Sequence, residues 1–176
     1  MANRSICTIN GVSVTLVKIP ARLLRNPLHL LSLGFGSGLS PRAPGTCGTL
    51  VAVPLFLGLT YLPFTWYLLF LLAAFAFGVL ICEYTSRALA VHDHPGIVWD
   101  EFVGYWITML AVPAEWLWIL LGFVLFRLFD IWKPWPVRIA DNTLKGGFGI
   151  MIDDVLAGLY ALASLHLAIW IVESHV

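Results

Sequence analysis

Charged side chains are scarce in this 176-residue sequence, where Asp, Glu, Lys and Arg make up only 11% of the residues. Soluble domains carry roughly 25%. Hydrophobic residues account for 60% of the chain, and its mean hydropathy is +0.88. The formal net charge is zero, so we expect no nucleic-acid partner. The composition is typical of a membrane protein, and we expect one membrane-embedded helical domain over residues 1–176.

Cysteine is also sparse, and its positions argue against two kinds of site. Cys7, Cys47 and Cys82 are isolated from one another and odd in number. This arrangement favours neither a disulfide framework nor a zinc site.

Acidic residues are absent from the first 49 positions, which carry five basic residues and therefore a charge of +5. The positive-inside rule places this end of the chain in the cytoplasm. We expect no signal peptide, because the apolar stretch Ile6–Ile19 is interrupted by polar residues and lacks a small-residue cleavage site. Residues 1–27 are interpreted as a basic amino-terminal extension.

Three long apolar segments predict membrane helices. Phe64–Cys82 carries no charge and is long enough for about 28 Å of helix. Phe102–Trp132 is too long for one plain span, and Pro113 cuts it near the middle, so we expect a helix, a tight turn and a second helix. Val155–Val172 supplies the last helix. The predicted fold class is all-α: a multi-pass helical membrane protein built from short helical hairpins, with polar glycine-rich loops on one face.

Pairs of carboxylates stand at the start of two of these segments. Asp153 and Asp154 precede the last segment, and Asp100 and Glu101 precede the expected hairpin. A carboxylate beside hydrocarbon costs several kcal/mol unless a cation, hydrogen bonds or a proton compensates it. Capping of the first helical turn is the alternative interpretation, and it accounts for one carboxylate of a pair more easily than for two.

The expected hairpin would return a fifth acid to the same face. Its second helix ends near Arg127, Asp130 and Lys133, and a turn at Pro113 would bring these side chains back beside Glu101. Arg127 and Asp130 are three residues apart, so a simple salt bridge along the helix is the alternative.

Two further segments carry candidate phosphate ligands and acid–base groups. The glycine-rich stretch 34–49 is not expected to form a regular helix. It offers backbone N–H groups and the hydroxyls of Ser40 and Thr46 where a helix is expected to begin at Leu50, an arrangement that suits phosphate. His92 and His94 are candidates for acid or base, and hydrogen bonding within their own turn is the alternative.

Clustered carboxylates repel one another unless a hard divalent cation lies among them, and oxygen ligands favour Mg²⁺ or Mn²⁺ over zinc. Asp100 is a further catalytic candidate, and we expect Arg127 and Lys133 to bind phosphate. Phosphoryl chemistry requires such a combination of metal and cations, and the membrane composition indicates a lipid phosphate as substrate. Four carboxylates are the expected metal ligands: Glu101, Asp130, Asp153 and Asp154.

Six motifs resemble, in their order along the chain, those of the bacterial phosphatidylglycerophosphatase A family: Gly-Ser-Gly-Leu-Ser-Pro (36–41), Pro-Gly-Thr (44–46), His-Asp-His (92–94), Ile-Val-Trp-Asp-Glu-Phe (97–102), Trp-Lys-Pro-Trp-Pro (132–136) and Gly-Ile-Met-Ile-Asp-Asp (149–154). The resemblance covers about residues 28–160, which we expect to be the catalytic core. It implies an all-α fold and Mg²⁺-dependent removal of the terminal phosphate from phosphatidylglycerophosphate, which yields phosphatidylglycerol. It also implies the bacterial inner membrane, and the basic amino-terminal region predicts an active site that faces the cytoplasm.

Two alternative functions would use the same acidic residues: a small ion or proton transporter, and a non-catalytic lipid-binding subunit. Transport predicts acids in the middle of spans, whereas here they stand at segment ends beside glycine-rich loops. This placement favours an enzyme. The sequence leaves open the number of metal ions, the choice between direct water attack and a covalent phosphoenzyme, the preference among lipid phosphates, and the oligomeric state.

Overall fold

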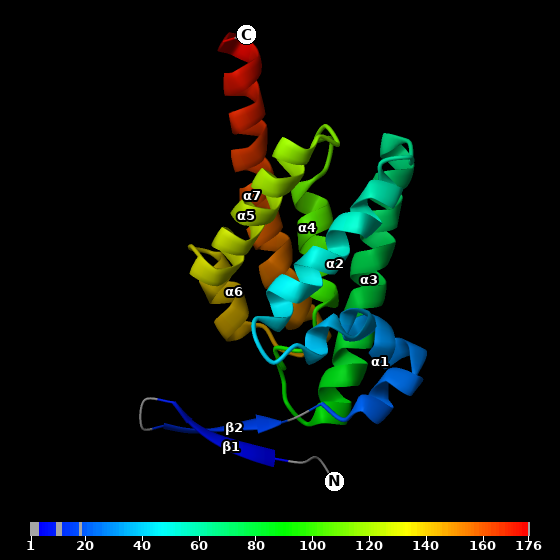
Figure 1. Ribbon diagram of the computed structural model, residues 1–176, viewed down its shortest axis with the longest axis vertical. Helices are drawn as coiled ribbons and strands as arrows, with labels where there is room; N and C mark the ends of the chain where they lie inside the picture. Colours follow the sequence, from blue (N-terminus) through cyan, green and yellow to red (C-terminus); the bar gives the residue numbers. More distant parts are fainter. Residues whose placement is uncertain (1–3, 10–11, 18, 176) are drawn as a thin grey trace.

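The computed structural model describes residues 4–9, 12–17 and 19–175, and the chain is helical after Pro20 (Figure 1). Within these ranges, two strands, two 3₁₀ helices and seven α-helices follow in this order: β1 Arg4–Ile9, β2 Val12–Val17, η1 Ala21–Arg25, α1 Pro27–Ser32, η2 Gly34–Leu39, α2 Pro44–Leu59, α3 Phe64–Leu89, α4 Trp99–Thr108, α5 Trp116–Trp132, α6 Val137–Thr143 and α7 Gly146–His175.

The helical fold class is confirmed for the chain after Pro20, and the amino-terminal residues add two strands that were not expected from the sequence. β1 and β2 pair antiparallel, with Arg4 opposite Val17 and Ile9 opposite Val12. The β-branched residues Ile, Val and Thr recur along both strands, and such side chains fit a pleated strand better than a helix.

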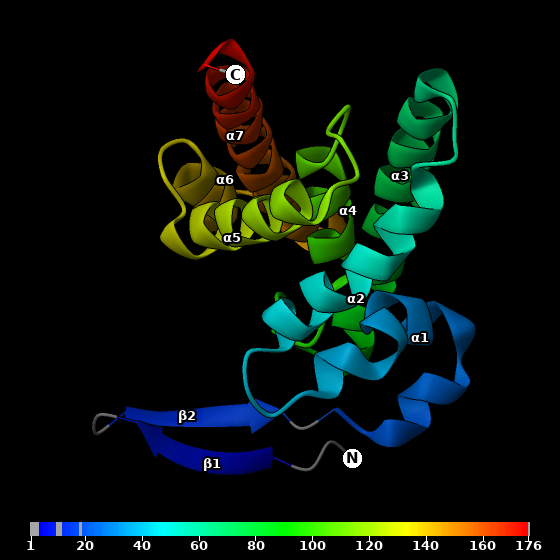
Figure 2. The same ribbon diagram turned by 45° about the horizontal axis from the view of Figure 1, so that its top comes forward.

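Helix α7 lies at the centre of the bundle and packs against α3, α4, α5 and α6 (Figures 1 and 2). Its contact with α4 depends on glycine, because a Cβ on Gly158 would lie 2.5 Å from the carbonyl oxygen of Gly104. Ala157 and Ala161 on the same helix are fully buried. Small side chains therefore let the helices approach closely.

The segment 102–132 forms the predicted helix, turn and second helix. α4 ends at Thr108, and α5 begins at Trp116. Pro113 lies in the turn between them, where the chain also takes a left-handed conformation at Ala111 with a φ of 57°. The two helices contact each other, so the end of α5 returns to the beginning of α4.

Helices α3 and α7 are long and apolar enough to cross a membrane. Only 28% of the most apolar stretch of each is buried inside the protein. The outer faces of α3, α5 and α7 instead carry large exposed apolar side chains, among them Leu72, Leu80, Leu120, Val124, Leu167 and Trp170. Contiguous apolar surface of this kind suits lipid contact better than water.

Candidate active site

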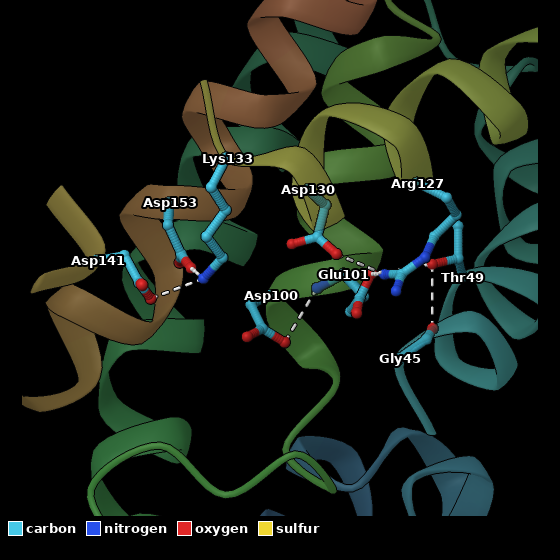
Figure 3. A network of polar contacts seen from close by, with 9 residues as sticks. All are labelled: Gly45, Thr49, Asp100, Glu101, Arg127, Asp130, Lys133, Asp141 and Asp153. Carbon is cyan, nitrogen blue, oxygen red and sulfur yellow. Dashed lines mark hydrogen bonds and ion pairs between the residues drawn. The ribbon is translucent and has the colours of Figure 1, made fainter. Parts of the chain in front are cut away.

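Polar and charged side chains from five helices, α2 and α4 to α7, meet at the end of the bundle that holds the first turn of α4 (Figure 3). The helices bring together residues that lie up to about a hundred positions apart in the sequence, in chain order Thr49, Asp100, Glu101, Arg127, Asp130, Lys133, Asp141 and Asp153. Four of the predicted catalytic acids are buried, with at most 9% exposure: Asp100, Glu101, Asp153 and Asp154.

Glu101 is the centre of one half of this cluster. Its Oε2 accepts a hydrogen bond of 2.9 Å from the hydroxyl of Thr49. The same oxygen forms an ion pair with Nη1 of Arg127. The same Nη1 lies 2.9 Å from Oδ2 of Asp130. The predicted Arg127–Asp130 pair is therefore confirmed, but it is not a simple pair along one helix. Arg127 joins α5 to α4 and balances two carboxylates at once.

The amino end of α2 lies directly against this half. A Cβ on Gly45 would overlap Oε1 of Glu101, so only glycine lets the backbone approach so closely. α2 begins at Pro44 rather than at the expected Leu50, because proline is well suited to the first position of a helix. The first turn of α2 thus presents Gly45 to the cluster.

The two predicted phosphate-binding hydroxyls differ in their surroundings. Thr46 is half-buried in that first turn of α2. The hydroxyl of Ser40 donates to the carbonyl oxygen of Arg42 at 2.8 Å and so closes the preceding turn. Thr46 therefore lies in a helix next to Gly45 and not in the loop expected for residues 34–49, whereas Ser40 stabilises the turn that leads into α2.

Lys133 is the centre of the second half of the cluster. Its Nζ donates to Oδ1 of Asp141 at 2.6 Å and to Oδ2 of Asp153 at 2.8 Å. Burial by itself lowers the pKa of Lys133, but the hydrogen bonds to the two carboxylates outweigh burial and raise the pKa above its usual value. Lys133 is therefore a permanent positive charge between α6 and α7.

Asp100 lies between the two halves (Figure 3). Its Oδ1 accepts from the backbone N–H of Glu101 at 3.0 Å. Asp154 lies within electrostatic range of Asp100, Glu101 and Asp130. The two pairs of adjacent acids predicted from the sequence thus belong to one cluster.

The interpretation of Asp153 and Asp154 as caps of a helix is wrong. α7 begins at Gly146, so these two acids are its eighth and ninth residues and lie in the third turn. They do not stand at a helix end, as was expected, because the glycine-rich stretch before them is itself helical. A capping role requires the first turn.

The first turn of α7 is capped by residues from elsewhere. The N–H of Gly146 donates to Nε2 of His92 at 2.7 Å, and the N–H of Gly147 donates to Oε2 of Glu83 at 2.7 Å. Nδ1 of His94 accepts from the N–H of Gly96 at 3.0 Å. The hydrogen-bonded turn is therefore confirmed for His94, and His92 holds the start of α7.

The charge balance of the cluster bears on whether a metal ion fits. As the side chains stand, no three His, Cys, Asp or Glu groups in the part of the chain that the structure describes converge closely enough to hold an ion. The donor chemistry suits Mg²⁺, because all donors are oxygens, and Oδ1 of Asp153 is buried without a hydrogen-bond partner. Two cations face six carboxylates: Asp100, Glu101, Asp130, Asp141, Asp153 and Asp154.

Two members of the cluster, Thr49 and Asp141, were not identified from the sequence. Thr49 was placed in a loop, and its role becomes visible only when α2 is extended to Pro44. Asp141 lies in the polar stretch before α7 and has no local pattern that distinguishes it. Its partner Lys133 is eight residues away, across the turn between α5 and α6.

Comparisons with known proteins identify the family of the chain. Residues 30–169 match the family model described as phosphatidylglycerophosphatase A. The chain is 49% identical to phosphatidylglycerophosphatase A of Escherichia coli over 81% of its length and 84% of the relative. It is 51% identical to phosphatidylglycerophosphatase A of Haemophilus influenzae over 79% and 86%.

A third relative, from Bacteroides thetaiotaomicron, bears the provisional name of a phosphatidylinositol-3-phosphatase and is 43% identical over 81% of this chain and 94% of its own. No solved structure matches the chain significantly. The match to the family model covers most of the chain, and it includes all five predicted catalytic acids. The chain therefore belongs to the phosphatidylglycerophosphatase A family.

Proposed function

We propose that this protein hydrolyses the terminal phosphate of phosphatidylglycerophosphate and releases phosphatidylglycerol, with Mg²⁺ as cofactor. The observation that carries the proposal is the cluster of buried carboxylates around Arg127 and Lys133 in a chain of this family. Phosphomonoester hydrolysis needs cations for the phosphate oxygens and groups that activate water. The cluster contains both kinds of side chain.

The substrates named for the relatives share one chemical feature. Phosphatidylglycerophosphate and phosphatidylinositol 3-phosphate each carry a phosphomonoester on a polyol that a phosphodiester joins to diacylglycerol. We assign the first lipid to this chain because the family model and two relatives carry that name.

Arg127, Lys133 and the first turn of α2 would bind the phosphate. Nε of Arg127 is buried without a partner and is a free donor for a phosphate oxygen. The first amides of α2, at Gly45 and Thr46, have no partner within the helix, and a helix amino end favours an anion. Ser40 would act by holding the preceding turn.

The carboxylates would hold Mg²⁺ and handle the proton. When bound, Mg²⁺ supplies charge neutralisation and a more acidic water molecule. Oδ1 of Asp153 has no partner and is the oxygen best placed to accept a proton or to bind the ion. Glu101 and Asp153 would turn partly away from Arg127 and Lys133, which frees both cations for phosphate. Four residues would hold the ion: Glu101, Asp130, Asp153 and Asp154.

We further propose a multi-pass placement in the bacterial inner membrane, with the cluster at the cytoplasmic face. α3 and α7 would cross the membrane, and the α4–α5 hairpin would enter it between them. The basic residues of the amino-terminal region support the orientation, since the side chains of Arg22, Arg25 and Arg42 are all exposed. In Figure 1 this region lies at the opposite end from the α4–α5 turn.

The test is phosphate release by the purified protein in mixed micelles that contain phosphatidylglycerophosphate, phosphatidic acid or phosphatidylinositol 3-phosphate. We expect the highest kcat/KM on phosphatidylglycerophosphate, and a loss of at least about a hundredfold in Glu101→Gln. Glu173→Gln, an exposed acid near the end of α7, is the matched control. Absence of phosphate release on all three lipids would favour the transporter or the lipid-binding subunit.

A further inference from the structure

A groove of about 650 Å³ adjoins the acidic cluster between the end of α5 and helix α6. Ligand-binding pockets commonly have volumes of roughly 300–1,000 Å³. Lys133 belongs to both places, because it lines the groove and donates to Asp153 in the cluster. The lining residues are Trp132, Lys133, Pro134, Trp135, Arg138, Ile139 and Thr143.

Contacts to α7 and α5 hold the walls of the groove in place. The hydroxyl of Tyr160 in α7 donates to the carbonyl oxygen of Trp135 at 2.8 Å. The ring of Trp132 stacks on Phe129, with 6.4 Å between the ring centres. At Lys133 the chain takes a left-handed turn with a φ of 45°, and Asp141 of the following helix α6 lies 2.6 Å from Nζ of Lys133. The groove is therefore a built feature rather than a gap beside a loose loop.

The groove and the cluster differ in the sign of their charge. Lys133 and Arg138 are the two charged side chains among the described residues that line the groove, and no acid is among them. The adjoining cluster is rich in carboxylates. An anionic group is therefore attracted to the groove, whereas it is repelled by the cluster unless a metal ion is present.

Two tryptophans place the groove at the level of lipid headgroups. Trp132 is 67% exposed and Trp135 is 75% exposed. Exposed tryptophan on a membrane protein is enriched at the boundary between hydrocarbon and water. A lipid whose headgroup enters the groove would therefore keep its acyl chains in the bilayer.

We propose that this groove binds the phosphodiester of the lipid substrate and that Arg138 is the residue that recognises it. The inference rests on the proposed function, since it concerns the second phosphate of the same substrate. Only the glycerol unit separates the two phosphates of phosphatidylglycerophosphate. Lys133 is shared between the groove and the cluster, so the terminal phosphate can reach the acids while the phosphodiester lies beside Arg138. The groove thus selects lipids that carry both groups.

The test compares phosphatidylglycerophosphate with phosphatidic acid, which has a phosphomonoester but no phosphodiester. Arg138→Gln removes the charge, and Arg138→Lys keeps it. We expect Arg138→Gln to lower kcat/KM on phosphatidylglycerophosphate about tenfold to a hundredfold, mainly through KM, and to change kcat/KM on phosphatidic acid by less than about threefold. Arg138→Lys should retain more activity than Arg138→Gln. Arg22→Gln, an exposed basic residue in η1, is the matched control.

Several outcomes would overturn the inference. An equal loss of kcat/KM on both lipids would mean that Arg138 does not distinguish the phosphodiester. No loss on either lipid would mean that Arg138 does not bind the substrate. If the loss depends on the mole fraction of other anionic phospholipids in the micelle, the groove binds bulk lipid instead. If the wild-type protein hydrolyses phosphatidic acid but not phosphatidylglycerophosphate, the substrate assignment is wrong. If it hydrolyses neither lipid, the proposed function itself is contradicted.

Discussion

The ammonium of Lys133, immediately after α5, lies 2.8 Å from Oδ2 of Asp153 in the third turn of α7. Asp141 of α6 shares the same ammonium at 2.6 Å. Lys133 also lines the groove beside Arg138. One side chain therefore connects the acidic cluster, the short helix α6 and the groove that we assign to the phosphodiester.

Asp153→Asn and Asp154→Asn test whether these acids act in catalysis. At position 153 asparagine keeps an oxygen that can accept from Lys133, and at both positions it removes a buried negative charge. We therefore expect the free energy of unfolding to change by no more than about 1.5 kcal/mol. Phosphate release should fall by roughly a hundredfold or more. Thermal unfolding and phosphate release measured on the same preparations separate the two effects.

The two variants should not be equivalent. Adjacent helical residues point about 100° apart. Asp153 contacts Lys133, whereas Asp154 interacts electrostatically with Asp130 and Glu101. We expect unequal losses, with partial recovery of the weaker variant at high Mg²⁺. Near-normal turnover of both variants would move the metal-binding role to Glu101 and Asp130.

Removal of divalent metal should abolish phosphate release. Among the described residues, Arg127 and Lys133 form ion pairs with four of the six carboxylates of the cluster, and a hard cation would compensate the remaining negative charge. We expect activity to disappear after treatment with a chelator and to return with Mg²⁺. Zn²⁺ is the informative comparison, because oxygen ligands favour Mg²⁺. Full turnover in chelator after exhaustive dialysis would contradict a metal-dependent mechanism.

Gly158→Ala should destabilise the contact between α4 and α7. The added Cβ would lie 2.5 Å from the carbonyl oxygen of Gly104, and overpacking of this kind costs about 1–3 kcal/mol. Gly58→Ala in α2 is the matched control, because no atom lies within 4 Å of its added Cβ. It should stabilise the helix by roughly 0.5–1 kcal/mol. Thermal unfolding in detergent measures both, and equal effects would refute the role of the close contact.

Cysteine labelling tests the proposed topology. Pro95 and Thr143 are exposed near the cluster, and Ala114 is exposed in the α4–α5 turn. With the native cysteines replaced, single cysteines at positions 95 and 143 should react with an impermeant maleimide from the cytoplasmic side, and a cysteine at position 114 from the opposite side. Reaction of positions 95 and 143 from opposite sides would exclude a hairpin that returns to the cluster.

Local patterns in the sequence were sufficient for several features. Proline cannot continue a helix, so Pro113 predicted the turn between α4 and α5. The three-residue spacing of Arg127 and Asp130 predicted their ion pair. The scarcity of charge and the order of the motifs predicted the helical fold and the family. Each of these properties depends on neighbouring residues or on composition.

Other boundaries depended on contacts with distant parts of the chain. Gly146 and Gly147 are poor helix formers, and the sequence therefore placed the start of the last helix after Asp154. In the folded protein their N–H groups donate to His92 and Glu83, which satisfies the first turn of α7. At the amino end, the polar residues within Ile6–Ile19 argued against a signal peptide, but they did not predict that β1 and β2 pair as strands.

The amino-acid sequence by itself determined the membrane-type composition, the hairpin at Pro113 and five of the six acidic residues of the cluster. Only the tertiary structure decided which cation balances which acid. Arg127 reaches Glu101 because α5 folds back on α4, and Lys133 reaches Asp153 because α6 and α7 pack beside the end of α5. The physical reason is that such pairs form between side chains 20 or more residues apart, whose distance is set by helix packing and not by spacing along the chain.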